Sequence, residues 1–252
     1  MSDAYVFLGP TLTVADAKAE LDAVYLPPVS AGDVFRLQDK RPRAIGIVDG
    51  YFEHVPAVWH KEIMWIMAQG VHVFGSAGLG ALRAAELDSF GMRGVGRVYQ
   101  AVKDGALDRD DEVAVACEEE ADGYRALSEA MVNIRATLEA AQRAQIITDA
   151  TRDALAATGA ALFYRDRTWP ALLEAGKPAG ADPAELSALR RWLPAGRIDQ
   201  QADDAVAMLR EIRDLLAGSP DPLRVPWTVA NTTRLLAGKD YADNGGGPGD
   251  DR

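Results

Sequence analysis

The chain has 252 residues, of which 48% are hydrophobic and 26% charged, a composition typical of a globular protein with a sizeable core. Its formal charge of −11 disfavours nucleic acid as a partner, because nucleic-acid binders gather lysine and arginine against phosphates. One cysteine and three histidines disfavour a metal site, and no motif indicates a cofactor. No apolar run is long enough to cross a membrane and no signal pattern opens the sequence, so we expect a cytoplasmic protein without a membrane segment.

Short β-rich runs alternate with helical patterns in the first half of the chain. The pattern predicts strands at 4–9, 23–28, 43–50 and 71–76, and helices at 13–22, 32–37, 57–69 and 79–91. A further apolar run, at 111–116, is a candidate for the last strand. This alternation is typical of an α/β fold, with an N-terminal parallel sheet flanked by helices.

From about residue 121 the apolar residues recur at three- and four-residue intervals, as in amphipathic helices. We therefore predict an α/β domain over 1–120 that carries the reactive site and an all-helical C-terminal layer over 121–240 packed on it. The remaining residues, 241–252, are rich in glycine and aspartate and are predicted to be disordered.

The segment VFGSAGLGALRAAEL, 73–87, runs from a predicted strand through a glycine-rich turn into a helix. Such a turn lifts Ser76 above the sheet, as in the nucleophile elbow of hydrolases, although the glycine two places before the serine is missing. Its backbone N–H groups would bind an oxyanion or a phosphate. The residues expected there are Gly75, Ala77, Gly78, Leu79 and Gly80, with Gly80 also allowing close packing of the helix. A purely structural turn is the alternative.

The preceding helix offers a base for this serine. Lys61 lies in an otherwise apolar helix, which predicts a partly desolvated amine able to act as a general base. His60 and Asp49 would orient it or relay a proton. The alternatives are that Lys61 reaches solvent, His60 satisfies a structural hydrogen bond and Asp49 marks a turn. Arg83 is expected to pair with Glu86, one turn away, or to contact a substrate or partner.

Several segments together resemble the TfuA-like family, in order and over about residues 4–175. They are FLGPTL, PPVSAGD, IGIVDGYFEHVPAVWHKEI, VFGSAGLGALRAAEL, FGMRGVG, DDEVAV, MVNIRATL and LFYRDRTWPALL. The resemblance implies a partner of a YcaO-type enzyme in backbone thioamidation of a peptide or protein. The implied role is hydrolysis of a ThiS-like thiocarboxylated sulfur-carrier protein to release sulfide, with help in substrate engagement. The Ser-Lys pair associated with the family falls on Ser76 and Lys61.

One position departs from the pattern of that family. Where a serine often precedes the Met/Leu-Gly-Ala-Leu-Arg run, this chain has Gly78. Two other functions therefore stay open beside the hydrolase. One is a non-catalytic adaptor that docks the YcaO enzyme and its substrate, and the other is a phosphate- or nucleotide-binding protein that uses the same helix N-terminus.

Overall fold

The computed structural model describes residues 2–52 and 55–230. The predicted tail, 241–252, and the last ten residues of the predicted helical region lie outside these ranges. Residue contacts divide the chain into two units, one formed by Met1–Ala106 with the chain from Ala202 onward, the other by Leu107–Gln201. Within the described ranges, no helix is both long and apolar enough to cross a membrane.

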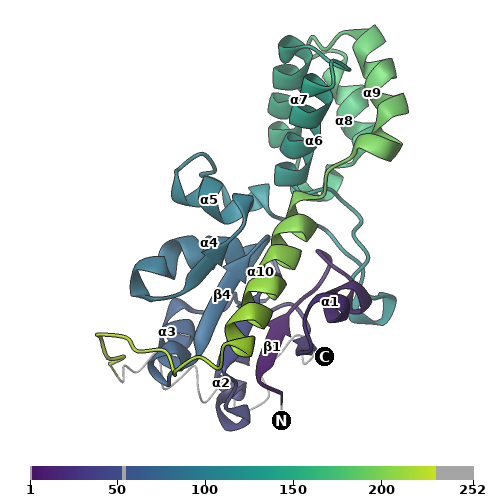
Figure 1. The fold of residues 1–252 in the computed structure, drawn as a ribbon. Coiled ribbons are helices and arrows are strands. Elements are labelled where there is room, and N and C mark those ends of the chain that lie inside the picture. Colours follow the sequence, from purple (N-terminus) through teal and green to yellow (C-terminus); the bar gives the residue numbers. More distant parts are fainter. Residues whose placement is uncertain (1, 53–54, 231–252) are drawn as a thin grey trace, which may run out of the picture. The chain divides into compact units, whose positions relative to one another are not determined.

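The first unit contains a five-stranded sheet whose strands are all parallel, in the order β2-β1-β3-β4-β5 (Figure 1). The strands are β1 Ala4–Phe7, β2 Val24–Leu26, β3 Ala44–Ile47, β4 His72–Ser76 and β5 Arg93–Val95. The first four lie within the predicted runs. The predicted strand at 111–116 is wrong, because this segment forms a short 3-10 helix, Asp110–Glu112, and a loop in the second unit. The sheet instead ends with β5, a three-residue strand without an alternating apolar pattern.

Helices cover both faces of this sheet, as parallel sheets require. They are α1 Val14–Glu20, α2 Asp33–Arg36, α3 His60–Ala68, α4 Leu79–Leu87, α5 Arg97–Lys103 and α10 Gln200–Ala217. Successive strand residues point to opposite faces. Ile45 and Val73 join one buried cluster with α2, α3 and α4, whereas Val6 and Phe74 join another with α1 and α10. In Figure 1, α10 runs along the sheet on the second of these faces.

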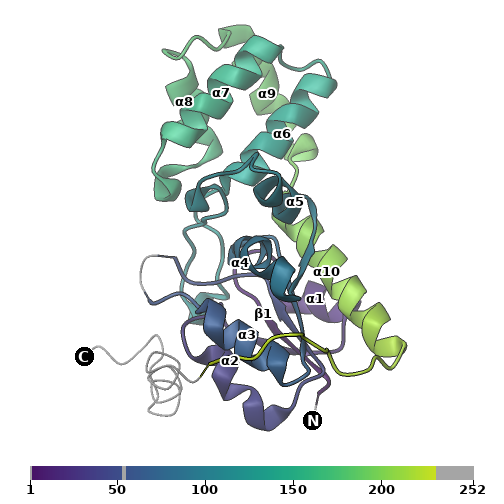
Figure 2. The same cartoon turned by 90° about the vertical axis from the view of Figure 1, so that its left-hand side faces the viewer.

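The second unit is helical, which confirms the predicted helical C-terminal region (Figure 2). Its helices are α6 Met131–Arg143, α7 Asp149–Ala161, α8 Trp169–Gly176 and α9 Pro183–Gly196. The side chains of Thr148, Thr168 and Asp182 accept backbone N–H groups at the starts of α7, α8 and α9. Helix α6 begins ten residues later than predicted, because turns precede it and Tyr124 has a φ of 56°.

A buried arginine connects segments of the second unit. Only 1% of Arg167 is exposed, and its guanidinium donates to Gly159 O (3.0 Å) and Asp111 O (2.6 Å). A third bond reaches the Asp111 carboxylate. Burial alone would raise the pKa of Asp111, but hydrogen bonds from Arg109 and Arg167 outweigh it and hold the pKa below its usual value. Asp111 is therefore a charged partner for Arg167 inside this unit.

Candidate functional site

The strand order places a topological switch point between β1 and β3, where the connections leave toward opposite faces of the sheet. Ligands of open α/β sheets bind at the carboxyl ends of strands at such points. Here the loops after β1 and β3 are joined by the buried carboxylate of Asp49. It accepts the N–H groups of Gly9 (2.8 Å) and Thr11 (3.2 Å) and the Thr11 hydroxyl (2.6 Å). Asp49 thus holds the shape of the switch point.

Helix α4 begins directly beside this carboxylate. Gly78 has φ −92° and ψ −128°, a combination outside the regions usual for other residues. A Cβ on Gly78 would lie 3.1 Å from Asp49 Oδ1, and one on Gly80 would lie 1.8 Å from Ile47 O. Gly80 N also donates to Val48 O at 3.1 Å. These contacts confirm that Gly80 lets the helix pack closely on the strand, here at the end of β3.

Ser76 is the last residue of β4 and is not exposed at all. It points to the same face as Phe74, into the cluster with α1 and α10, and its Oγ has no hydrogen-bond partner among the described residues. The prediction that the turn lifts Ser76 above the sheet is therefore wrong. In a nucleophile elbow the serine itself occupies the strained turn. Here the residue with positive φ is Ala77, at 61°, and its side chain is also buried.

The two charged residues at the start of α3 are placed differently from expectation. Lys61 is exposed, so its predicted desolvation is wrong, whereas its neighbour Glu62 is completely buried. Because α3 begins only at His60, Glu62 is its third residue and accepts the N–H of the preceding Trp59 at 2.7 Å. Glu62 also accepts Gly32 N at 3.0 Å. Burial raises the pKa of Glu62 to about 7.

His60 of α3 and Arg83 of α4 both contact Glu86 of α4. Arg83 bonds Glu86 at 2.8 Å, which confirms the predicted pair, and it also donates to Val58 O at 3.2 Å. His60 Nε2 lies 2.7 Å from the same Glu86 oxygen. His60 and Glu86 are each nearly half exposed, so a partner molecule can reach them.

The predicted site residues therefore form separate groups. Asp49 and Gly78 meet at the switch point, and His60 meets Arg83 through Glu86. Ser76 joins neither group by a hydrogen bond, and it is not bonded to Lys61. Helices α3 and α4 pack on the sheet face opposite the one to which Ser76 points.

Sequence reasoning missed three residues at this edge of the sheet. Gly9 and Thr11 follow β1 in a Gly-Pro-Thr turn, a signal that was available in the sequence. The third is Asp204 of α10, which is buried and accepts Val98 N at 2.7 Å just after β5. No local pattern links Asp204 to the sheet, since more than one hundred residues separate it from Val98.

Comparison with known protein families agrees with the resemblance in the sequence. Residues 49–168 match a family model described as TfuA-like protein. Over these residues the chain carries a TfuA-like domain. The matched segment of this TfuA-like chain begins at Asp49 and includes α3, α4 and the first helices of the second unit. No curated protein matches the chain. The described ranges contain no group of three or more histidine, cysteine or acidic residues able to hold a metal ion.

Proposed function

We propose that this TfuA-like chain is the partner of a YcaO-type enzyme in thioamidation of a peptide or protein backbone. In this role it binds a ThiS-like thiocarboxylated sulfur carrier and presents it to the enzyme without hydrolysing it. The family match supports the association with YcaO enzymes. The observation that carries the non-hydrolytic role is the complete burial of Ser76.

A serine nucleophile must approach the carbon it attacks to about 3–3.5 Å. The carrier's thiocarboxylate ends a protein chain, so the nucleophile also has to be reachable from the surface. Ser76 has no exposed area, and its hydroxyl has no hydrogen bond to a base in the described part of the chain. This arrangement supports an adaptor better than a hydrolase.

The rim of the switch point offers a place for the carrier's C-terminal end, because Gly50 and Leu79 are partly exposed there, unlike Ser76. A thiocarboxylate is an anion, and anions are stabilised near a helix N-terminus such as the start of α4. Asp49 uses its carboxylate to bind loop N–H groups and the Thr11 hydroxyl, which keeps the loops in place beside Gly78. His60, at the start of α3, and Arg83, in the middle of α4, add polar and cationic groups for the carrier's surface.

Hydrolysis is the second candidate, and the unpaired Ser76 hydroxyl favours it. Buried polar atoms without a partner are rare and are found at reactive sites. Ser76 Oγ would lose its proton to Lys61 and attack the thioacid carbon, giving an oxyanion held by N–H groups at the start of α4. Sulfide would leave as the acyl-enzyme forms, and water would cleave that ester. This route requires an opened state in which both Ser76 and Lys61 reach the carrier.

Reconstitution separates the two candidates. The YcaO enzyme, ATP, the thiocarboxylated carrier and the peptide are mixed with or without this chain, and the thioamide is measured by mass spectrometry. Free sulfide is measured in a parallel reaction without the YcaO enzyme. The adaptor predicts chain-dependent thioamide and only background sulfide. Sulfide release by the chain alone would contradict the adaptor and support hydrolysis.

A further inference from the structure

A segment after α10 crosses to the opposite side of the first unit and lies along α3 (Figures 1 and 2). We call residues 222–230 the C-terminal strap. Its apolar side chains alternate with exposed residues, as in an extended peptide with one side facing a surface. The half-buried side chains, all packed against the cluster with α2, α3 and α4, are Leu223, Val225, Trp227 and Val229.

The surface under the strap is shaped by glycines at the ends of two helices. Gly70 follows α3 and Gly91 follows the short 3-10 helix Asp88–Phe90 after α4, with φ of 92° and 110°. A Cβ on Gly70 would lie 3.0 Å from Pro222, and one on Gly91 would lie 3.6 Å from Val225. Larger residues would narrow this groove as well as strain the backbone. The groove thus has room for an extended chain across both helix ends.

Two hydrogen bonds between described residues hold the strap in the groove. Leu223 N donates to Gly70 O at 2.8 Å, and the Trp227 indole N–H donates to Phe90 O at 3.2 Å. The half-buried apolar side chains of the strap pack on the cluster below it. Main-chain bonds with pockets for alternate side chains are also how proteins bind extended peptides from other molecules.

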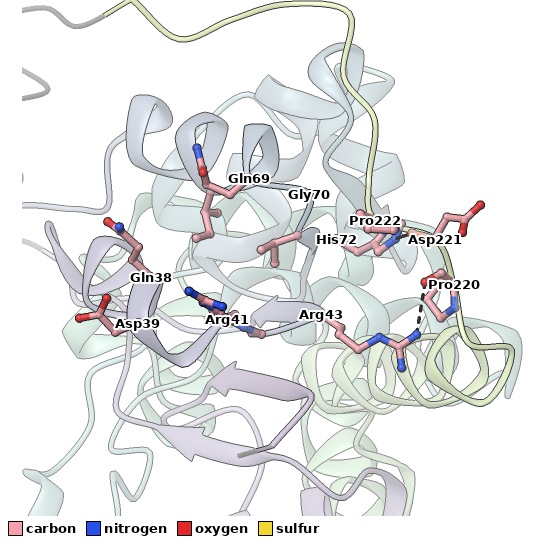
Figure 3. Close-up of a pocket in the computed structure, with 13 residues that line it drawn as sticks. Gln38, Asp39, Arg41, Arg43, Gln69, Gly70, His72, Pro220, Asp221 and Pro222 are labelled. Carbon is pink, nitrogen blue, oxygen red and sulfur yellow. Dashed lines mark hydrogen bonds between the residues drawn. The ribbon is translucent and has the colours of Figure 1, made fainter.

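The root of the strap borders a cavity of about 430 Å³, shown in Figure 3. Arg43 donates to Pro220 O at 3.3 Å, and His72 Nε2 lies 2.9 Å from Asp221 O. Arg41 and Gln69 line the cavity on the side away from these bonds. The root of the strap is therefore held by two polar contacts beside open space, whereas residues 223–229 pack on the buried cluster.

We infer that the groove at the ends of α3 and α4 is a peptide-binding site, filled in this structure by the chain's own strap. The partner that fits it is an extended peptide with apolar side chains at every second position. The strap competes with this partner from within the same chain, at an effective concentration on the order of millimolar. A peptide in solution therefore binds strongly only when its affinity is high or the strap is weakened.

Weakening the strap in the full chain tests this inference. We would compare wild type with Trp227→Ala and Val225→Ala, using Thr228→Ala as the matched control because Thr228 is exposed on the same strap. The probe is a fluorescent peptide with the sequence of residues 220–230, PDPLRVPWTVA. Its binding is followed by fluorescence anisotropy, and thermal melting shows whether each variant is folded.

We expect the peptide to bind Trp227→Ala and Val225→Ala at least about tenfold more tightly than wild type or Thr228→Ala. In wild type, excess peptide should speed hydrogen exchange of the amides at 223–229, since it displaces the strap. Absence of saturable binding to both folded variants would overturn the inference. Exchange of straps between two copies, seen as a dimer by light scattering, would also overturn it. None of these measurements requires a YcaO enzyme, so they do not depend on the proposed function.

Discussion

The two units use buried acidic residues in different ways. In the first unit, Asp49 and Glu62 accept backbone N–H groups from neighbouring loops. In the second, Glu112 forms a two-bond pair with Arg135, and Glu129 lies 2.6 Å from Arg197. The first arrangement fixes loop shape at the carboxyl edge of the sheet. The second joins segments of the helical unit through charge.

The difference extends to protonation. Glu62 is surrounded by N–H donors, but its burial dominates and raises the pKa to about 7. Asp111 also loses hydration, yet Arg109 and Arg167 together hold its pKa below the usual value. Glu62 therefore makes the first unit sensitive to pH near neutrality, whereas Arg109 and Arg167 keep Asp111 charged. Four predictions test this comparison.

The largest effect is expected from Arg167→Met in the second unit. This change leaves the Asp111 carboxylate and two buried carbonyl groups without the guanidinium, and we expect a loss of about 3–5 kcal/mol in the free energy of unfolding. Urea denaturation followed by circular dichroism measures it. The control is Arg109→Ala, which removes the more exposed partner of Asp111 and should cost much less, because solvent screens an exposed pair. Equal losses would show that burial does not decide the strength of these pairs.

The second-largest loss of stability is expected from a steric change in the first unit. Gly80→Ala would place a methyl group 1.8 Å from Ile47 O, between a helix and a strand that have little freedom to move apart. We expect a loss of about 3 kcal/mol in unfolding free energy. In Gly218→Ala the nearest atom would be 3.4 Å away, and stability should change by less than about 0.5 kcal/mol. Similar melting temperatures for both variants would contradict the close packing of α4.

The pH dependence of stability should reveal Glu62. Its pKa is raised from 4.5 to about 7 on folding, so the folded state keeps a proton that the unfolded state releases. Unfolding free energy should therefore decrease as pH rises from about 4.5 to 7, by at most about 3 kcal/mol. Glu62→Gln cannot titrate and should reduce this slope. An unchanged slope in that variant would mean that another group causes it.

The smallest effect is expected at the exposed cluster of α3 and α4. His60 and Glu86 are each nearly half exposed, so their contact should contribute less than about 1 kcal/mol. Thermal melting of His60→Ala and Glu86→Gln should therefore resemble that of wild type. A large loss of stability would mean that this cluster supports the fold and is less suited to partner binding.

Local patterns predicted much of the fold. The first four strands and the first helices were visible as apolar runs between glycine, proline and aspartate. Strand β5 was not, because three residues containing Arg93 and Gly94 carry no apolar alternation. The packing of α10 on the sheet was equally hidden, since a helical period reveals an apolar face and not which surface covers it.

The site was predicted only in part, for a similar reason. The positions of Asp49 and Gly80 could be predicted, because helix starts lie beside the carboxyl ends of the strands. Both residues lie at the switch point. The burial of Ser76 depends on the direction of its side chain and on α10, which is far away in sequence. The choice between Lys61 and Glu62 as the buried residue depended on a helix start displaced by three residues. Sequence periodicity does not define boundaries that closely.

The most direct test of the proposed adaptor role compares Ser76→Ala with Asp49→Ala in the reconstituted thioamidation reaction, once circular dichroism shows that both are folded. Ser76 is buried without a hydrogen bond, whereas Asp49 holds the loops at the switch point. The adaptor role predicts thioamide formation near the wild-type rate with Ser76→Ala and a loss of at least about tenfold with Asp49→Ala. Loss of thioamide formation with Ser76→Ala, and its retention with Asp49→Ala, would contradict the adaptor and assign the reaction to the serine.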